Sequence, residues 1–380
     1  MTGQLPYGSH THNFICKTSR NISHIASSWV IIVLRNLIFA AVTWLAAFLV
    51  YVYPLTALNH LITDAPIITH SALIATTVVT ALLFYYFRTH ATAAWLGGFA
   101  HYGIGIGFIG TTITSIGLLT AILAPGYSAT IGMICLVTMI GTSLSAIIQG
   151  RRLTLKSLTI SSDKIKVDKK LIFISDVHLG SNPKSHLAHI CEKINALDYD
   201  ALLIGGDLFD SSAFQTDDLA PLLSLSKPIY FVTGNHEFYV RDHQTKIASL
   251  GDYNIQNIDN KTATLDEVTI IGIGDKQSPA TQTDIAKKLV KPHRFNLILV
   301  HQPAIWQTLP DEADFMISGH THNGQIFPFN LLVRLQFKAV YGLYQHKTAQ
   351  LYVSSGAACW GPRMRLGTKN EIIHLSLCKS

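Results

Sequence analysis

Residues 313–325 read ADFMISGHTHNGQ, and they pass from an apolar run into two histidines separated by a single residue. The run is typical of a buried β-strand, and glycines on both sides of His320 and His322 allow the backbone to turn sharply. A pair of this kind is often a surface accident in a chain with 18 histidines. The alternative is metal binding, because neutral imidazole is a common metal ligand. The rest of the chain decides between these interpretations.

Four other apolar runs in the second part of the chain end in Asp, His or Asn. They are KLIFISDVHLG (170–180), YDALLIGGDLFD (199–210), KPIYFVTGNHEF (227–238) and RFNLILVHQP (294–303). Short apolar runs that alternate with polar helical stretches predict an α/β domain. Ligand sites in open α/β sheets lie beyond the carboxyl ends of the strands, so we expect the polar residues to converge there.

Seven nitrogen and oxygen donors follow these five runs, which is too many for one tetrahedral ion and suits two ions that share a carboxylate. They are Asp176, His178, Asp207, Asn235, His301, His320 and His322. The five cysteines are scattered without a Cys-x-x-Cys pair, which argues against a structural zinc site or a disulfide framework. Mixed imidazole and carboxylate donors suit Mn, Fe or Zn. We therefore expect two divalent metal ions, with Mn favoured.

The series Asp-x-His, Gly-Asp-x-x-Asp, Gly-Asn-His-Glu, a single His and Gly-His-x-His resembles the calcineurin-like metallophosphoesterase family. The resemblance extends over roughly residues 160–380. GHTHNGQ (319–325) is similar to a membrane-attached branch that usually reads Gly-His-Thr-His-Gly-Gly-Gln, and the closing segment 351–377 is similar to the same branch. Asn323 replaces one of those glycines. Since Asn enters positive φ more readily than other non-glycine residues, we expect the turn to persist.

The resemblance implies a fold and a role for each residue. The fold is an α/β sandwich of two sheets flanked by helices at residues 170–380, preceded by a linker and first strand region at 151–169. One metal ion would be held by Asp176, His178, Asp207 and His322, and the other by Asp207, Asn235, His301 and His320, with Asp207 bridging. His236 would protonate the leaving oxygen or stabilise the transition state, and Asp210 would orient it. Glu237 is not expected to be catalytic.

Residues 1–150 have a different composition, with only four of the 29 Lys and Arg residues and one of the 23 Asp and Glu residues. Four apolar runs of about 20 residues, the length that crosses a bilayer, predict transmembrane helices within residues 36–150. They lie at residues 36–55, 66–87, 102–123 and 128–149. Basic residues precede the first run and follow the second and fourth. This pattern predicts that segment 1–35 and the phosphoesterase domain lie on the cytoplasmic side of the cell inner membrane.

Two features of the apolar region allow a second interpretation. GIGIGFIG (103–110) contains the Gly-x-Gly-x-x-Gly pattern of dinucleotide sites, but inside an apolar run it favours close packing between helices. The histidines near the ends of the runs could bind haem, although interfacial positions are favoured. These histidines are His60, His70, His90 and His101.

A membrane-attached phosphoesterase has a high effective concentration toward lipids, so we expect the bilayer and a lipid-linked phosphate substrate as partners. The favoured reaction is hydrolysis of a phosphodiester or pyrophosphate bond, and some relatives of the resembled branch act on UDP-2,3-diacylglucosamine. The alternatives are a general phosphodiesterase or phospholipid phosphatase, and a membrane scaffold or sensor with an inactive domain. Scattered basic residues predict no nucleic-acid partner, and no protein partner is predicted.

Segment 326–342 follows the histidine pair and is strongly apolar, with Arg334 and Lys338 interspersed. Such a segment could lie on the membrane interface beside the site. It could equally form a buried strand and helix of the core. The sequence leaves both interpretations open.

Overall fold

The computed structural model describes residues 33–89, 94–211, 213–346 and 349–380. Four of its helices are long and apolar enough to cross a membrane, and we call them the four apolar helices. They span Val33–Thr63, His70–Arg88, Trp95–Leu123 and Pro125–Arg151. The four runs expected from the sequence are thereby confirmed as helices, and the first, third and fourth helices are longer than expected. Most of segment 1–35, together with His90, lies outside the described residues.

The apolar helices comprise several elements in chain order. These are η1 (Phe48–Val52), α2 (Tyr53–Thr63), α3 (His70–Thr89), α4 (Ala94–Leu123), η2 (Pro125–Tyr127) and α5 (Ser128–Arg151). The GIGIGFIG segment lies inside α4, where a Cβ atom on Gly107 would overlap the carbonyl of Val50, and one on Gly103 would overlap the ring of Tyr51. The interpretation of these glycines as helix-packing residues is therefore confirmed.

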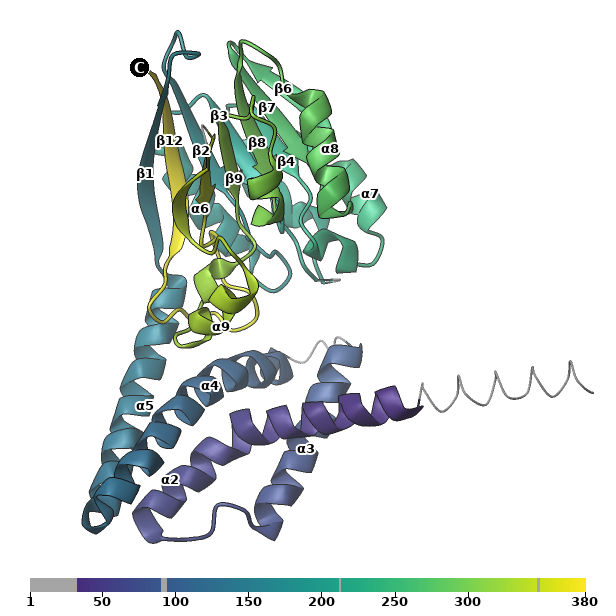
Figure 1. The fold of residues 1–380 in the computed structure, drawn as a ribbon. Helices are drawn as coiled ribbons and strands as arrows, with labels where there is room; N and C mark the ends of the chain where they lie inside the picture. Colours follow the sequence, from purple (N-terminus) through teal and green to yellow (C-terminus); the bar gives the residue numbers. More distant parts are fainter. Residues whose placement is uncertain (1–32, 90–93, 212, 347–348) are drawn as a thin grey trace, which may run out of the picture.

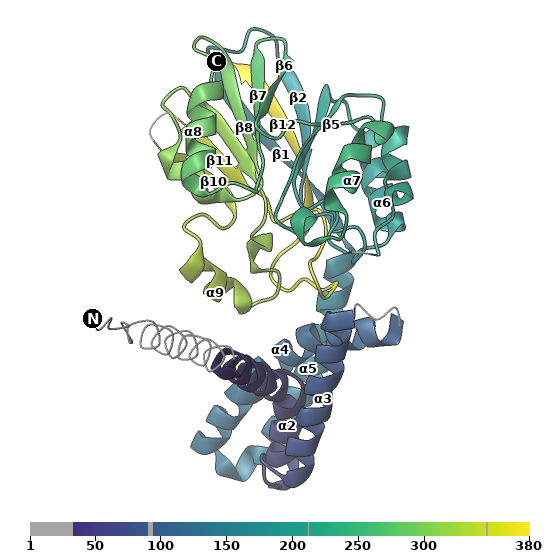
Figure 2. The same cartoon turned by 90° about the vertical axis from the view of Figure 1, so that its right-hand side faces the viewer.

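Residues 153–380 form a sandwich of two six-stranded mixed sheets, which we call the sandwich domain (Figures 1 and 2). The first sheet has the order β1 (Leu153–Ser162), β12 (Asn370–Lys379), β2 (Lys169–Ile174), β3 (Ala201–Gly205), β4 (Ile229–Val232) and β5 (Ile255–Asn257). The second has the order β10 (Gly342–His346), β11 (Ala349–Val353), β9 (Phe315–Ser318), β8 (Phe295–Val300), β7 (Val268–Ile273) and β6 (Lys261–Leu265). Side chains such as Phe173, Leu203 and Leu297 fill the space between the sheets.

Helices cover the outer faces of both sheets, as expected for this sandwich. On the first sheet lie α6 (Lys184–Asn195), η3 (Thr216–Ser224), α7 (His243–Ala248) and η5 (Ser249–Tyr253), and on the second lie α8 (Pro279–Leu289) and η6 (Pro303–Thr308). Three short helices, η4 (His236–Tyr239), η7 (His322–Gly324) and α9 (Phe329–Gln336), follow the ends of strands β4 and β9.

The direction of β1 sets which edge of the sandwich faces the apolar helices. α5 ends at Arg151 and β1 begins at Leu153, so β1 runs away from α5 (Figure 1). β12 is parallel to β1, and β2 is antiparallel to β12, so β2 runs back toward α5. β3, β4 and β5 are parallel to β2. The carboxyl ends of these strands, where ligand sites form in α/β sheets, therefore face the apolar helices.

Hydrogen bonds fix the sandwich domain to the end of α5. The backbone N–H of Arg365 donates to the carbonyl oxygen of Ala146 at 2.8 Å. The side-chain amide of Asn370 donates to the carbonyl oxygen of Gly150, also at 2.8 Å. Gly150 is one of the last four residues of α5, whose carbonyl oxygens have no partner within the helix. The region expected as a linker and first strand contains β1, a ten-residue strand that follows α5 with only Arg152 between them.

The structure decides between the two interpretations of segment 326–342. Its helix, α9, is described throughout, and Val333 is its one buried residue. Both views place α9 at the edge of the sandwich domain that faces the apolar helices (Figures 1 and 2). The interpretation of this helix as a buried helix of the core is therefore wrong, because at least half of the surface of Leu331, Leu332 and Leu335 is exposed.

Candidate metal centre

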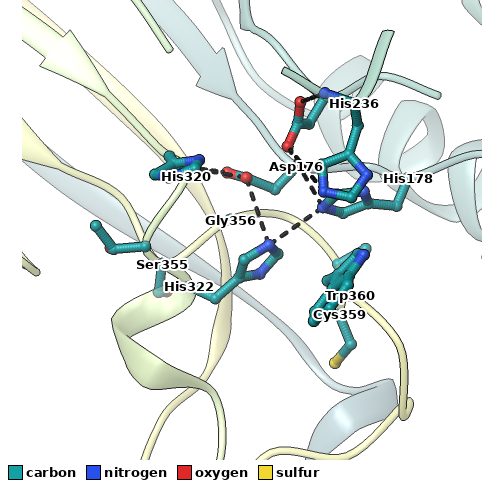
Figure 3. Close-up of polar contacts among 12 residues, drawn as sticks. Asp176, His178, His236, His320, His322, Ser355, Gly356, Cys359 and Trp360 are labelled. Carbon is teal, nitrogen blue, oxygen red and sulfur yellow. Dashed lines mark hydrogen bonds and ion pairs between the residues drawn. The ribbon is translucent and has the colours of Figure 1, made fainter. Parts of the chain in front are cut away.

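The five strand ends identified from the sequence meet at one edge of the sandwich. β2 is followed by Asp176 and His178, β3 by Asp207, β4 by Asn235 and His236, β8 by His301, and β9 by His320 and His322. Figure 3 shows Asp176, His178, His236, His320 and His322 turned toward a common centre. The structure thus brings together six of the seven residues expected to bind metal, although their elements lie far apart in the sequence, and Asn235 directly precedes His236.

Asp176, His178 and His322 form the first group of donors. The Nε2 atoms of His178 and His322 lie 3.1 Å apart, and Nε2 of His322 lies 3.5 Å from Oδ1 of Asp176 (Figure 3). Two imidazole nitrogens that face each other beside a carboxylate suit a shared cation, which accepts a lone pair from each of them. The chemistry of this group therefore fits a divalent metal ion.

Asp207, His301 and His320 form the second group. Nε2 of His301 lies 3.1 Å from Oδ2 of Asp207 and 3.2 Å from Nδ1 of His320. Nδ1 of His301 lies 2.8 Å from the carbonyl oxygen of Gly205, which can accept only if this nitrogen carries the proton. That bond fixes the tautomer that leaves Nε2 free to bind a metal.

Asp207 lies between the two groups, as a bridging ligand must. Its Oδ2 atom is 3.9 Å from Nε2 of His178 in the first group, in addition to its contact with His301 in the second. Oδ1 of Asn235 is buried near this centre and has no hydrogen-bond donor among the described residues. An amide oxygen buried without a partner costs free energy, and metal coordination would offset that cost. The donor set as a whole therefore fits two divalent ions.

Five of the seven expected ligands are held in backbone conformations that residues other than glycine rarely adopt. Asp176, His178, Asp207, His320 and His322 all have φ values between 49° and 72°. Such conformations cost free energy, cluster at functional sites and persist only where the surroundings enforce them. Here the backbone N–H of His178 donates to the carbonyl oxygen of Asp207 at 2.9 Å, and that of His320 donates to the Asp176 carboxylate at 3.2 Å.

The turn after the histidine pair forms as expected. Asn323, which stands where the resembled branch usually has glycine, has a φ of 53°. Asn tolerates this left-handed region better than most residues, so the departure from glycine leaves the turn intact.

His236 lies at the mouth of the centre, with 17% of its side chain exposed. Its Nε2 atom is 4.0 Å from Oδ2 of Asp207, and its ring centroid is 4.8 Å from that of His178. Burial lowers the pKa of His236, against the opposing charge of Asp207. Trp360 and Tyr239 flank its ring, with centroids at 5.8 Å and 5.2 Å.

Asp210 has a different neighbour from the one expected. Its Oδ2 atom lies 3.2 Å from Nδ1 of His178, and its Oδ1 atom accepts from the backbone N–H of Ser181 at 3.1 Å. The reason is local, because the backbone N–H of Asp210 donates to the carbonyl oxygen of Leu179 and holds Asp210 beside this segment. In the structure Asp210 thus lies beside His178, an expected metal ligand, whereas the resemblance implied that it orients His236.

Glu237 connects two of the ligand-bearing loops. It is fully buried, and its carboxylate accepts from the backbone N–H groups of Asp207, Leu208, Phe209 and Gly234. These donors belong to the loops that follow β3 and β4. The side chain of Glu237 thus sets the spacing between Asp207, the residue expected to bridge the metals, and the segment that carries Asn235.

Arg365 is a site residue to which the sequence assigned no role. Its fully buried guanidinium donates to the carbonyl oxygens of His322 at 2.7 Å, Ser355 at 2.6 Å and Ala358 at 2.8 Å. Burial, together with the nearby His178 and Arg365, holds the pKa of His322 well below its usual range. His322 therefore stays neutral, as a metal ligand must. The one signal in the sequence was a charged residue within the glycine-rich closing loop.

Residues 169–324 match the calcineurin-like phosphoesterase family. This part of the chain is a calcineurin-like phosphoesterase domain. The match begins at β2 and ends at the histidine pair, so it contains every expected metal ligand.

Proteins similar to the chain include several metallophosphoesterases. An uncharacterized metallophosphoesterase of Helicobacter pylori is 36% identical over 235 residues, which cover 59% of this chain and 63% of that protein. One of Campylobacter jejuni is 33% identical over 234 residues, which cover 58% and 62%. A transmembrane protein with metallophosphoesterase domain of Bos taurus is 34% identical over 234 residues, which cover 55% and 52%. The chain thus spans less than two thirds of the length of these relatives. The last name and the four apolar helices support association of the phosphoesterase domain with a membrane.

Proposed function

We propose that the chain is a membrane-bound phosphoester hydrolase that uses two divalent ions, with Mn²⁺ favoured, to cleave a phosphodiester or pyrophosphate bond of a lipid-linked substrate. The observation that carries the proposal is the position of the seven donors, which lie at the edge of the sandwich that faces the four apolar helices. A site tethered at this position has a high effective concentration toward bilayer lipids.

When bound, two divalent ions would neutralise phosphoryl charge and supply an activated water. The side chains of the chain itself set the geometry around them. Asp210 orients the ring of His178, and the carbonyl of Gly205 orients the ring of His301. His236 lies at the mouth beside Asp207, where it can donate a proton to the leaving oxygen or stabilise charge that develops on it.

A hollow of about 430 Å³ adjoins the centre at Asn235 and offers space for a polar headgroup. It is lined by Asn235, Phe238, Tyr239, His243, Gln244, Asp275 and Lys276. The aromatic rings can stack on a planar group, and Lys276 can pair with a second phosphate. These features favour a substrate with a large headgroup, for which UDP-2,3-diacylglucosamine is our first candidate.

Hydrolysis by the purified full chain in detergent with Mn²⁺ tests this proposal. Bis-p-nitrophenyl phosphate and UDP-2,3-diacylglucosamine are offered to the wild type, to Asp207→Asn, and to Asp198→Asn as a control at an exposed carboxylate. We expect turnover of both substrates by the wild type and the control, and its loss in Asp207→Asn. Cleavage of the soluble ester alone would retain the hydrolase and reject this lipid. No turnover of either would contradict the proposal.

A further inference from the structure

We infer that α9 is an interfacial helix that lies in the membrane surface and forms the entry through which a lipid-linked substrate reaches the metal centre. The membrane contact rests on the position and exposure of α9. The delivery of substrate rests on the proposed function. The two parts are therefore tested separately.

The first observation is a patch of exposed apolar side chains on and beside α9. The exposed fractions are 84% for Leu335, 54% for Leu332, 50% for Leu331, 49% for Phe327 and 46% for Phe329. A contiguous apolar patch on a protein surface marks a contact with a partner or a membrane. Basic residues lie within and just after it, at Arg334 and Lys338, as in helices that bind anionic lipid surfaces.

The position of α9 identifies lipid as the occupant of this patch. The ring of Phe329 packs edge-on against that of Phe108 in α4, with centroids 5.9 Å apart. Just before α9, Ile326 packs in a buried cluster with Ile109 and Ala146 of the apolar helices. α9 therefore lies beside the apolar helices (Figures 1 and 2). Side chains of those helices such as Leu119 and Val137 are also apolar and exposed. The lipid that surrounds those helices would therefore also cover the apolar patch on α9.

The other end of α9 reaches the metal centre. The ring centroid of Phe337, which caps the helix, lies 5.4 Å from that of the expected ligand His320. The eight residues of α9 extend over about 12 Å at 1.5 Å per residue. α9 thus leads from the contact with α4 to the centre. Acyl chains that lie along its leucines would place an attached phosphate beside His320.

Fluorescence quenching in reconstituted vesicles tests the membrane contact without any assay of activity. Leu335→Cys and the control Val167→Cys are labelled with an NBD fluorophore, both in a Cys16→Ser, Cys378→Ser background. Val167 is equally apolar and 59% exposed, but it lies beyond the far end of β1. The other cysteines of the chain are buried. The vesicles contain phosphatidylcholine, phosphatidylglycerol and a spin-labelled phosphatidylcholine that quenches NBD.

We expect strong quenching and a blue-shifted emission at position 335, and neither effect at position 167. Equal emission and quenching at the two positions would overturn the interfacial helix. Quenching at position 335 in a chain that hydrolyses no lipid would support the interfacial helix and count against the proposed function.

Kinetics of a double variant test the delivery of substrate. Leu332→Gln with Leu335→Gln removes the apolar surface and leaves every metal ligand in place, and Val167→Gln is the matched control. We expect at least a tenfold loss of turnover of the lipid substrate in vesicles, while turnover of bis-p-nitrophenyl phosphate stays within twofold of wild type. An equal loss on both substrates, or no loss on the lipid, would overturn the entry role.

Discussion

Single buried side chains hold the metal ligands in conformations that they would not adopt alone. Positive φ at Asp207 and His322 is costly for an aspartate or a histidine. Glu237 binds the backbone around the first of these residues, and Arg365 binds the backbone of the second. The geometry of the centre therefore depends on two buried residues, Glu237 and Arg365, that are not expected to touch the metal.

We predict that Glu237→Gln destabilises the domain by about 2–4 kcal/mol. A glutamine offers one acceptor oxygen to four backbone donors, and each buried donor left without a partner costs about 1–3 kcal/mol. The melting temperature of the detergent-solubilised chain should fall by about 5 °C or more. Glu192→Gln, at a side chain that is 80% exposed, is the control. Equal melting temperatures for Glu237→Gln and Glu192→Gln would show that the four hydrogen bonds to Glu237 contribute little to stability.

We predict that Arg365→Lys weakens metal binding by about 10–100-fold, the range found when residues that position metal ligands are replaced. A lysine cannot reach the carbonyls of His322, Ser355 and Ala358 together, because it lacks the forked guanidinium. Competition between the protein and a Mn²⁺-sensitive dye measures the change. Arg363→Lys, two residues away and partly exposed, should bind Mn²⁺ like wild type. An unchanged Mn²⁺ affinity in Arg365→Lys would show that Arg365 does not position His322 for metal binding.

At the scale of helices and strands, local sequence patterns predicted the strands and turns that carry the expected metal ligands. Each of the five ligand runs is a strand followed by a turn, so the ends of β2, β3, β4, β8 and β9 could be identified from apolar runs and the polar residues that follow them. The four apolar helices were predictable for the same reason, since length and hydropathy are local properties.

Contacts between distant segments could not be predicted in this way. The pairing of Leu153 with Asn370 joins residues from opposite ends of the sandwich domain. The contact of Arg365 with His322 depends on that pairing, because it brings the closing loop beneath the centre. The contact of Asp210 with His178, in place of the expected His236, has a related cause. A backbone hydrogen bond from Asp210 to Leu179 decides where the carboxylate of Asp210 lies.

We predict that Gly107→Ala destabilises the packing of α4 against η1. The added Cβ atom would overlap the carbonyl of Val50, and backbone atoms cannot rotate away as a side chain can. Overpacking of this kind costs about 1–3 kcal/mol. Gly141→Ala in α5 is the matched control, since a Cβ atom there meets nothing within 4 Å. Size-exclusion chromatography after heating should show earlier loss of the Gly107→Ala chain. Equal amounts of both variants remaining after heating would contradict the close approach of Gly107 to the carbonyl of Val50.

At the scale of the whole molecule, the candidate metal centre lies at the edge of the sandwich domain that faces the four apolar helices. α5 continues into β1, and the strand order then turns the carboxyl ends of β2 to β5 back toward the apolar helices. The donors come from both sheets, with Asp207 from the first and His301 from the second. Ions bound between them would therefore cross-link the two halves of the sandwich.

We predict that a chelator lowers the melting temperature of the full chain and that Mn²⁺ restores it. A ligand at 1,000 times its Kd stabilises a folded state by about 4 kcal/mol, provided that the unfolded chain does not bind it. The variant Asp207→Asn with His320→Ala keeps only the donor group of Asp176, His178 and His322, so its melting temperature should rise less with Mn²⁺ than that of the wild type. If the wild type melted at one temperature under both conditions, the donors would not form a metal centre.

The most direct test of the central claim is electron paramagnetic resonance of the full chain titrated with Mn²⁺. Asp207 contacts members of both donor groups, and ions in a two-metal site lie about 3.5–4 Å apart, which is close enough for their spins to couple. We expect the wild type to bind two ions per chain and to give an exchange-coupled spectrum that Asp207→Asn loses. A spectrum of isolated ions, or a single ion per chain, in the wild type would contradict the two-metal centre on which the proposed hydrolysis depends.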